Sequence, residues 1–235
     1  MRKVLFALTV LTLAATPALA AIATPHLAGS LQGWNPDANP MVETFPGSGI
    51  WTATFTGLTP GNREEFKVTD GTWDNTYPGA NSWLHVGPGG DITISYDTNV
   101  YADGWSPTTE RLGLSHDIGA WTAVGNWQGQ VGGGDWSNDN PATAMTPIGG
   151  GVYQLIATLL PGSYDWKAVV TGSWDSISWD NRSINTANWN FVTDAVNDTV
   201  VFEVNGLAGT ARVTVIPEPA SLALLALGLL ALRRR

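Results

Sequence analysis

The stretch YDWKAVVTGSW, residues 164–174, repeats the pattern of EFKVTDGTW, residues 65–73, about a hundred residues earlier. In each, an aromatic residue precedes a lysine, an apolar run leads into Gly-Ser or Gly-Thr, and Trp-Asp ends the unit. Residues alternate along YDWKAVV, so that Trp166 faces one side of a strand and Lys167 the other. Both stretches therefore predict a strand, then a glycine-containing turn that displays a tryptophan.

Outward from this unit, the two copies extend over most of the chain. Gly29 matches Gly125 and Gln32 matches Gln128, and the second copy then has an additional Gly-rich loop before its Asp-Trp. The paired segments are 27–34 with 123–136, 39–61 with 140–162, 64–75 with 164–176, and 81–97 with 187–205. The repeat predicts two domains, residues 22–108 and 117–216, that fold independently and are joined by a polar linker at 106–116.

Each copy has the sequence pattern of β structure. The runs IWTATFTGL and VYQLIATLL lead to Pro-Gly turns, and DITISYD and DTVVFEV are also typical of strands. No stretch between the two chain ends has a convincing helical period. The predicted fold is all-β, with two tandem immunoglobulin-like β-sandwich domains.

The first twenty residues have the pattern of a secretory signal peptide. Arg2 and Lys3 precede an apolar run, and TPALA stands before Ala21. A buried first helix is the alternative interpretation. Because the chain has no cysteine, disulfides cannot stabilise the exported protein, and its core must do so unaided.

The C-terminal segment 217–235 has three parts in order. The triplet Pro217, Glu218 and Pro219 precedes an apolar run, and the run precedes Arg233, Arg234 and Arg235. A helix over the thirteen apolar residues would span about 20 Å, which is short for a hydrocarbon core of about 30 Å. The arginines would stay on the cytoplasmic side of the membrane.

This tail resembles the PEP-CTERM sorting signal of Gram-negative bacteria. The resemblance implies that the secretion machinery exports the chain and an exosortase processes it. It also implies a transient inner-membrane anchor through the apolar helix, and delivery to the cell surface or extracellular matrix. A plain C-terminal anchor helix is the alternative.

The charge of the chain excludes some partners. Without the five basic residues of the two ends and Glu218, six basic and nineteen acidic residues remain, a net charge of −13. Such a surface repels nucleic-acid phosphates and anionic lipid. All 12 tryptophans lie between the two ends, more than a core of this size needs.

The repeated unit resembles the sandwich modules attached to pullulanases and, more distantly, the family-48 carbohydrate-binding modules. The resemblance is strongest over 121–177. It implies that a glucan lies on two tryptophans and the strand lysine, with an asparagine nearby. The positions are Trp136, Lys167, Trp174 and Asn188 in the second copy, and Trp34, Lys67, Trp73 and Asn81 in the first. The lysine-to-tryptophan spacing is seven residues in the second copy and six in the first, which departs from the pattern.

The chemistry of these residue types fits the implied role. An indole face stacks on the C–H-rich face of a sugar ring, and a lysine ammonium offers three donors to hydroxyl groups. Core packing is the alternative for the tryptophans and is expected for Trp51, Trp121 and Trp166. The lysines could equally be single surface charges.

No catalytic residues, cofactor or metal site are predicted. The three histidines are scattered, and Glu64 and Glu65 are adjacent, so on a strand they point to opposite faces and cannot flank one glycosidic bond. DTNVYADG, residues 97–104, lacks ligands that a calcium loop needs and is interpreted as turns. The sequence favours a non-catalytic protein that binds an α-glucan or an exopolysaccharide. The alternative is a structural or interaction protein of the extracellular matrix with no sugar ligand.

Overall fold

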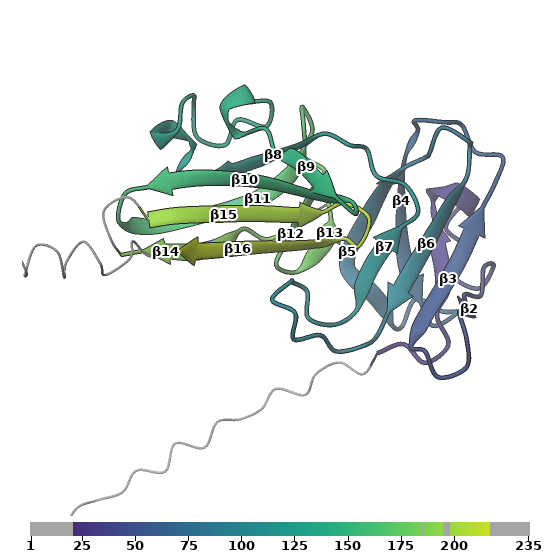
Figure 1. Ribbon diagram of the computed structural model, residues 1–235. Helices are drawn as coiled ribbons and strands as arrows, with labels where there is room; N and C mark the ends of the chain where they lie inside the picture. The colour runs from purple at the N-terminus through teal and green to yellow at the C-terminus, as the bar shows by residue number, and fades with distance from the viewer. Residues whose placement is uncertain (1–20, 185, 195–197, 217–235) are drawn as a thin grey trace, which may run out of the picture.

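The computed structural model describes residues 21–184, 186–194 and 198–216, and these residues form strands with three single-turn 3-10 helices (Figure 1). The first half of the chain holds β1 (His26–Gly29), η1 (Ser30–Gln32), β2 (Val42–Glu43), β3 (Ile50–Phe55), β4 (Arg63–Thr69), β5 (Thr76–His85), β6 (Ile92–Asp97) and β7 (Arg111–Leu114). The second half holds β8 (Trp121–Gly125), η2 (Gln128–Gln130), η3 (Pro141–Thr143), β9 (Thr146–Gly149), β10 (Val152–Leu159), β11 (Gly162–Val170), β12 (Ser176–Ser178), β13 (Asn181–Ser183), β14 (Trp189–Thr193), β15 (Asp198–Asn205) and β16 (Thr210–Ile216).

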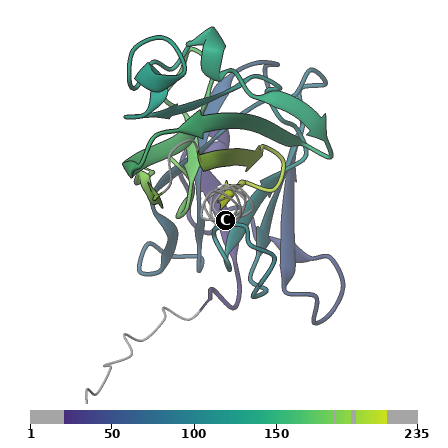
Figure 2. The ribbon, with the colours of Figure 1, turned by 60° about the vertical axis from the view of Figure 1, so that its left-hand side comes forward.

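The strands form four small antiparallel sheets. Sheet A has the order β1-β4-β5 and sheet B the order β2-β3-β6-β7. Sheet C has the order β16-β15-β10-β9, and sheet D has the order β13-β12-β11-β14 with β8 also on β11. The strands of the second half run across those of the first, as Figures 1 and 2 show. The predicted all-β class is confirmed.

Two hydrophobic clusters form the core. The first cluster lies between sheets A and B and includes Phe66, Leu84, Ile94 and Leu112. The second lies between sheets C and D and includes Trp121, Trp166 and Phe202. One member of the second cluster, Trp83, comes from β5 of the first half and is 1 % exposed. Because Trp83 crosses over, the second core is completed by the first half.

The sheets also contact one another outside the two cores. The backbone N–H of Ile184 donates to the carbonyl of Asn81, which joins sheets A and D, at 2.9 Å. Sheets B and C meet where the Leu114 N–H donates to the Leu207 carbonyl at 2.7 Å. Each sheet therefore contacts the next, and the four form a propeller-like ring. The prediction of two separate immunoglobulin-like sandwiches is wrong in this respect, because Trp83 of the first half completes the core of the second and backbone hydrogen bonds join the sheets of the two halves.

The polar segment 106–116 is not a free linker. It contains β7, which pairs with β6 in sheet B. Ser106 pairs with Ala211 through two backbone hydrogen bonds of 2.9 Å each. The segment is therefore built into both halves. The domain boundaries at 108 and 117 stay a prediction.

Several strands lie where alternation and turn signals predict them. The runs around 50–58, 92–97, 152–160, 164–170 and 198–204 contain β3, β6, β10, β11 and β15. The signal peptide and the C-terminal helix fall on residues 1–20 and 217–235, outside the described residues.

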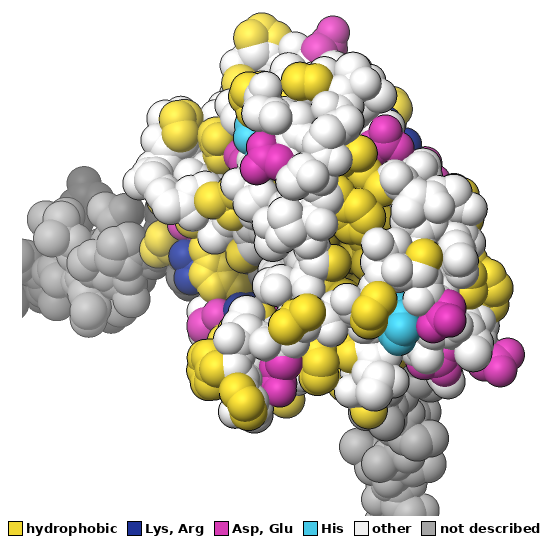
Figure 3. Space-filling model, turned by 90° about the vertical axis from the view of Figure 1, so that its right-hand side faces the viewer, with side chains coloured by type: hydrophobic (Ala, Val, Ile, Leu, Met, Phe, Trp, Pro, Cys, Tyr) yellow, Lys and Arg dark blue, Asp and Glu magenta, His cyan; other side chains and the backbone are white. Residues whose placement is uncertain are grey.

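On the face of the first half in Figure 3, yellow hydrophobic side chains gather in a central band with acidic side chains around it.

Candidate functional site

A short loop in the second half places Trp136. Trp136 has a left-handed backbone, φ 58°, which costs a non-glycine residue roughly 1–2 kcal/mol. Its N–H donates to the carbonyl of Gly125 at 3.1 Å. The buried Gln128 fixes the loop, because its Oε1 accepts from the N–H of Ser137 at 3.0 Å and its Nε2 donates to the Ser137 carbonyl at 3.0 Å. We call this arrangement the glutamine clamp.

The first half contains the same arrangement. Trp34 has φ 63°, and its N–H donates to the carbonyl of Gly29 at 2.9 Å. The Oε1 of Gln32 accepts from the N–H of Asn35 at 2.7 Å, and its Nε2 donates to the Asn35 carbonyl at 2.5 Å. The residues matched in the sequence therefore have matching contacts.

Each clamp begins at a glycine that touches the neighbouring strand. A Cβ at Gly125 would lie 2.2 Å from the carbonyl oxygen of Asp165, and one at Gly29 would lie 2.5 Å from that of Glu65. Asp165 and Glu65 each stand two positions before the repeated lysine. The glycines are required because a side chain would push the tryptophan loop off the strand.

The two lysines hydrogen-bond to backbone carbonyls. Lys167 Nζ donates to the carbonyl of Thr186 at 3.2 Å. Lys67 Nζ donates to the carbonyls of Pro78, at 2.9 Å, and Gly79. Burial lowers the pKa of both lysines. Since an ammonium has three donors, Lys167 keeps two N–H groups for another acceptor and Lys67 keeps one.

The alternation of YDWKAVV places Lys167 opposite the core residue Trp166 and so predicts an open, solvent-exposed face of sheet D around Lys167; the structure shows that this face is covered. Thr122, Val124 and Val169 lie on this face and are fully buried. Ala144, directly after η3, forms an isolated antiparallel bridge with Thr122, which places this segment beside β8. Lys167 therefore lies half-buried at the margin of a covered surface.

Trp174 and Trp73 are displayed as the sequence predicts. They are 53 % and 48 % exposed and occupy equivalent turns after β11 and β4. In the first half, the rings of Trp34 and Trp73 lie with centroids 6.4 Å apart, at 39°. In the second half, Asn138 joins the loop of Trp136 to the turn of Trp174, because its carbonyl accepts from the Gly172 N–H at 2.9 Å.

The two asparagines differ from each other. Asn188 is exposed, two residues after the Thr186 that contacts Lys167. Asn81 instead donates from Nδ2 to Glu65 Oε2 at 2.8 Å, where sheets A and D meet. The Asn81 side chain is therefore engaged within sheet A, and its carbonyl accepts from the Ile184 N–H of the second half.

Predicted packing tryptophans lie in the core. Trp121 and Trp166 are 1 % and 0 % exposed, and Trp51 packs partly exposed against the first core. Sequence reasoning missed Trp179, which is 49 % exposed in the turn between β12 and β13.

Asp180, next to Trp179, is a further polar group that the sequence did not single out. Burial raises the pKa of this carboxyl, and the Lys167 charge opposes that rise. Its Oδ2 accepts from the Ala187 N–H at 3.2 Å, whereas its Oδ1 is buried and makes no hydrogen bond among the described residues. The signal in the sequence was the order Ser-Trp-Asp at 178–180, which runs from the end of β12 into this turn.

The geometry defines an all-β protein that displays tryptophans on equivalent turns of its two halves. Comparison with known families places it further: residues 120–209 match the Pullulanase X25 domain, and residues 215–235 match the PEP-CTERM protein-sorting motif. The chain thus carries a PEP-CTERM sorting motif and, over residues 120–209, a pullulanase-associated module; the prediction of these two features is confirmed, and a second copy of the module in the first half stays a prediction. The motif indicates processing by an exosortase and export to the cell surface.

The relatives are much longer enzymes. An amylopullulanase of Thermoanaerobacterium thermosulfurigenes is 36% identical over 75 residues, which are 30% of this chain and 4% of the relative. Amylopullulanase of Thermoanaerobacter thermohydrosulfuricus is 30% identical over 91 residues, 34% of this chain and 6% of the relative. The chain therefore matches only a small part of these proteins.

Two solved structures are similar at low scores. Pullulanase from Bacillus acidopullulyticus has 17% identity and TM-score 0.33, with 55% of this chain and 20% of that chain covered. SusF from Bacteroides thetaiotaomicron has 15% identity and TM-score 0.33, with 86% and 50% covered. Neither likeness carries a functional argument. Within the described residues, no helix is long and apolar enough to cross a bilayer.

Proposed function

We propose that the protein is a non-catalytic polysaccharide-binding protein of the cell surface or extracellular matrix of a Gram-negative bacterium. The observation that carries the proposal is the exposure of Trp174 and Trp73 on equivalent turns, in a chain with an X25 domain. Large apolar rings on turns are costly to expose, and they suit stacking on sugar rings. The names of the domain and of the amylopullulanases suggest an α-glucan. An exopolysaccharide offers the same C–H faces.

In the second half, the ligand would lie across Trp174 and Trp136, with Lys167 at its edge. The two N–H groups that Lys167 keeps would donate to sugar hydroxyls. Asn188, exposed beyond Thr186, would add an amide contact. The half-buried ammonium gives up little hydration on binding, which favours its use as a donor.

The first half would be a second, diverged copy of this site. The matching glutamine clamps and the ring contact of Trp34 with Trp73 support this proposal. Lys67 already donates to two carbonyls and keeps one N–H group, and Asn81 is engaged elsewhere. The first site would therefore bind more weakly. Two weak sites on one polymer can raise the apparent affinity by about 10²-fold or more.

Affinity electrophoresis in gels with soluble starch, glycogen or the native exopolysaccharide tests the proposal. Trp174→Ala should reduce retention most, Trp73→Ala less, and the double variant should abolish it. Phe45→Ala is the matched control, because Phe45 is an exposed aromatic residue, 64 % exposed, outside the proposed sites. Its retention should equal that of the unsubstituted protein.

Thermal melts of the same variants separate binding from packing. Because both indoles are about half exposed, their removal should leave Tm almost unchanged, whereas a buried Trp→Ala costs about 3–5 kcal/mol. Absence of retention in all three polysaccharides would refute the proposal and favour a structural protein of the matrix.

A further inference from the structure

Trp174 lies between residues that are held from two sides. On one side, Asn138 Nδ2 donates to the Ser173 carbonyl at 3.1 Å, which joins the turn to the loop of Trp136. On the other side, Asp175 is buried, with its side chain 6 % exposed, and faces the first half. Within the run 173–176, Trp174 alone is exposed. Its position therefore depends on what fixes its neighbours.

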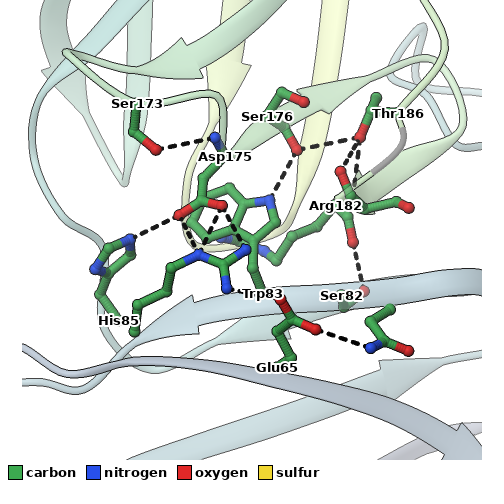
Figure 4. Close-up of polar contacts among 12 residues, drawn as sticks. Glu65, Ser82, Trp83, His85, Ser173, Asp175, Ser176, Arg182 and Thr186 are labelled. Atoms are coloured by element: carbon green, nitrogen blue, oxygen red, sulfur yellow. Dashed lines mark hydrogen bonds and ion pairs between the residues drawn. The ribbon is translucent and has the colours of Figure 1, made fainter.

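The first half fixes Asp175 (Figure 4). The guanidinium of Arg63 donates from Nε to both carboxylate oxygens at 2.9 Å and from Nη2 to Oδ1 at 2.8 Å. His85 Nε2 lies 3.1 Å from Oδ2. Burial alone would raise the pKa of Asp175, but the hydrogen bonds from His85 and Arg63 outweigh it and lower this pKa. Four contacts from β4 and β5 thus hold one carboxylate.

A second contact from the first half holds Ser176, the residue after Asp175. The indole N–H of Trp83, on β5, donates to the carbonyl of Ser176 at 3.1 Å. Arg63 is itself aligned by Glu65, whose Oε1 accepts from Nη1 at 2.8 Å. The backbone after Trp174 is therefore attached to sheet A as well as to its own sheet.

The equivalent turn of the first half differs in one respect. Both turns share one local hydrogen bond, because the Asp74 N–H donates to Thr72 Oγ1 and the Asp175 N–H donates to Ser173 Oγ, each at 3.1 Å. The difference lies in the carboxylates: Asp74, which follows Trp73, is exposed, whereas Asp175 is buried. The Trp-Asp pair thus has the same local turn in both halves, and in the second half the carboxylate of Asp175 also contacts Arg63 of the first half.

We propose that Arg63 and His85 are positioning residues for Trp174: through Asp175, the first half fixes the indole on which the second half binds polysaccharide. The inference rests on the proposed function of Trp174. A side chain that is fixed before binding loses less conformational freedom when a ligand stacks on it, and this raises affinity. The two halves are then one binding unit.

Retention measured in a Trp73→Ala background tests this, because only the second-half site then contributes. In the full chain, Arg63→Met should weaken retention in glycogen about three- to tenfold, the effect of ordering one side chain on binding. Arg63→Lys should recover part of the loss, since one ion pair to Asp175 can form. Arg212→Met is the matched control: it breaks an arginine–carboxylate pair with Glu203 in sheet C and should leave retention unchanged.

A spectroscopic measurement separates this inference from the proposed function. With 5-fluorotryptophan incorporated, Trp174→Phe identifies the ¹⁹F signal of Trp174. Arg63→Met should shift or broaden this signal in the absence of ligand, and Arg212→Met should not. If Arg63→Met cannot be recovered folded, Asp175→Asn, which keeps the side-chain shape, replaces it.

The outcomes are distinct. If Trp174→Ala abolishes retention but Arg63→Met neither weakens it nor changes the Trp174 signal, the positioning role is refuted. If the unsubstituted chain is not retained at all, the proposed function fails. A changed Trp174 signal in Arg63→Met would still establish that the first half positions the indole.

Discussion

Replacing Trp83 by alanine should destabilise the whole molecule, although Trp83 belongs to the first half. Its indole is buried in the second core, with its centroid 6.0 Å from that of Trp121, and it donates to the Ser176 carbonyl. Arg182, which is fully buried, lies over the Trp83 ring at 4.5 Å. A buried Trp→Ala costs about 3–5 kcal/mol, and loss of the indole hydrogen bond to the Ser176 carbonyl adds about 1 kcal/mol.

Urea unfolding of residues 21–216, followed by far-UV circular dichroism, measures this cost. We expect the free energy of unfolding to fall by about 4 kcal/mol or more, which corresponds to a Tm lower by about 8–16 °C for a protein of this size. The loss should appear in one transition, because the residue completes a core that both halves share.

Two substitutions serve as controls. Trp83→Phe keeps most of the apolar contact and loses the indole hydrogen bond, so it should cost about 1–2 kcal/mol. Trp51→Ala removes a partly exposed tryptophan that packs only on the first core and should cost less than Trp83→Ala. A loss below about 1 kcal/mol for Trp83→Ala, or separate transitions of which only one moves, would refute the shared core.

Asp175 has a lowered pKa, so its contribution to stability is present above its unfolded pKa of about 3.9 and is lost as pH falls through the lower folded value. Asp175→Asn should therefore flatten the acid decline in the free energy of unfolding, and an unchanged decline in a pH series would contradict the assignment. Gly125→Ala should destabilise by about 1–3 kcal/mol or more, because its Cβ meets the Asp165 carbonyl; a melt equal to the unsubstituted protein would show that the strand can move aside. Trp179→Ala should lower polysaccharide retention with no change in Tm, since the indole is about half exposed and lies beside the Lys167–Asp180 group; equal retention would confine the site to the turn of Trp174.

Strand positions could be predicted because alternation is a local property. The pattern around Trp166 and Lys167 gives β11 and the face of each side chain, and the exposed Trp174 follows from the turn. These features depend on the few residues around them. The all-β class and the display of the tryptophans therefore came from the sequence without further information.

The contacts between the halves could not be predicted in this way. Asp74 and Asp175 follow tryptophans in the same motif, and nothing near them indicates that one is exposed and the other faces Arg63. The sequence around Trp83 has the alternating pattern of an ordinary strand, and this pattern does not indicate in which core the Trp83 side chain is buried. The available signal was the scarcity of basic residues: Arg63 and Arg182, two of six between the chain ends, both lie at this contact.

The glutamine clamp keeps the tryptophan at the end of the loop in the same position, whatever the length of the loop. From glycine to tryptophan the chain advances five residues in the first half and eleven in the second, yet both tryptophans return to the same hydrogen bond with the glycine. Because loop-closure entropy rises only about 0.6 kcal/mol for each doubling of length, such insertions are inexpensive once the ends are fixed. A duplicated unit of this kind can acquire new loop sequences while its indole stays in place, and the segment between Gln128 and Asp135 is where foreign peptides could be grafted for display.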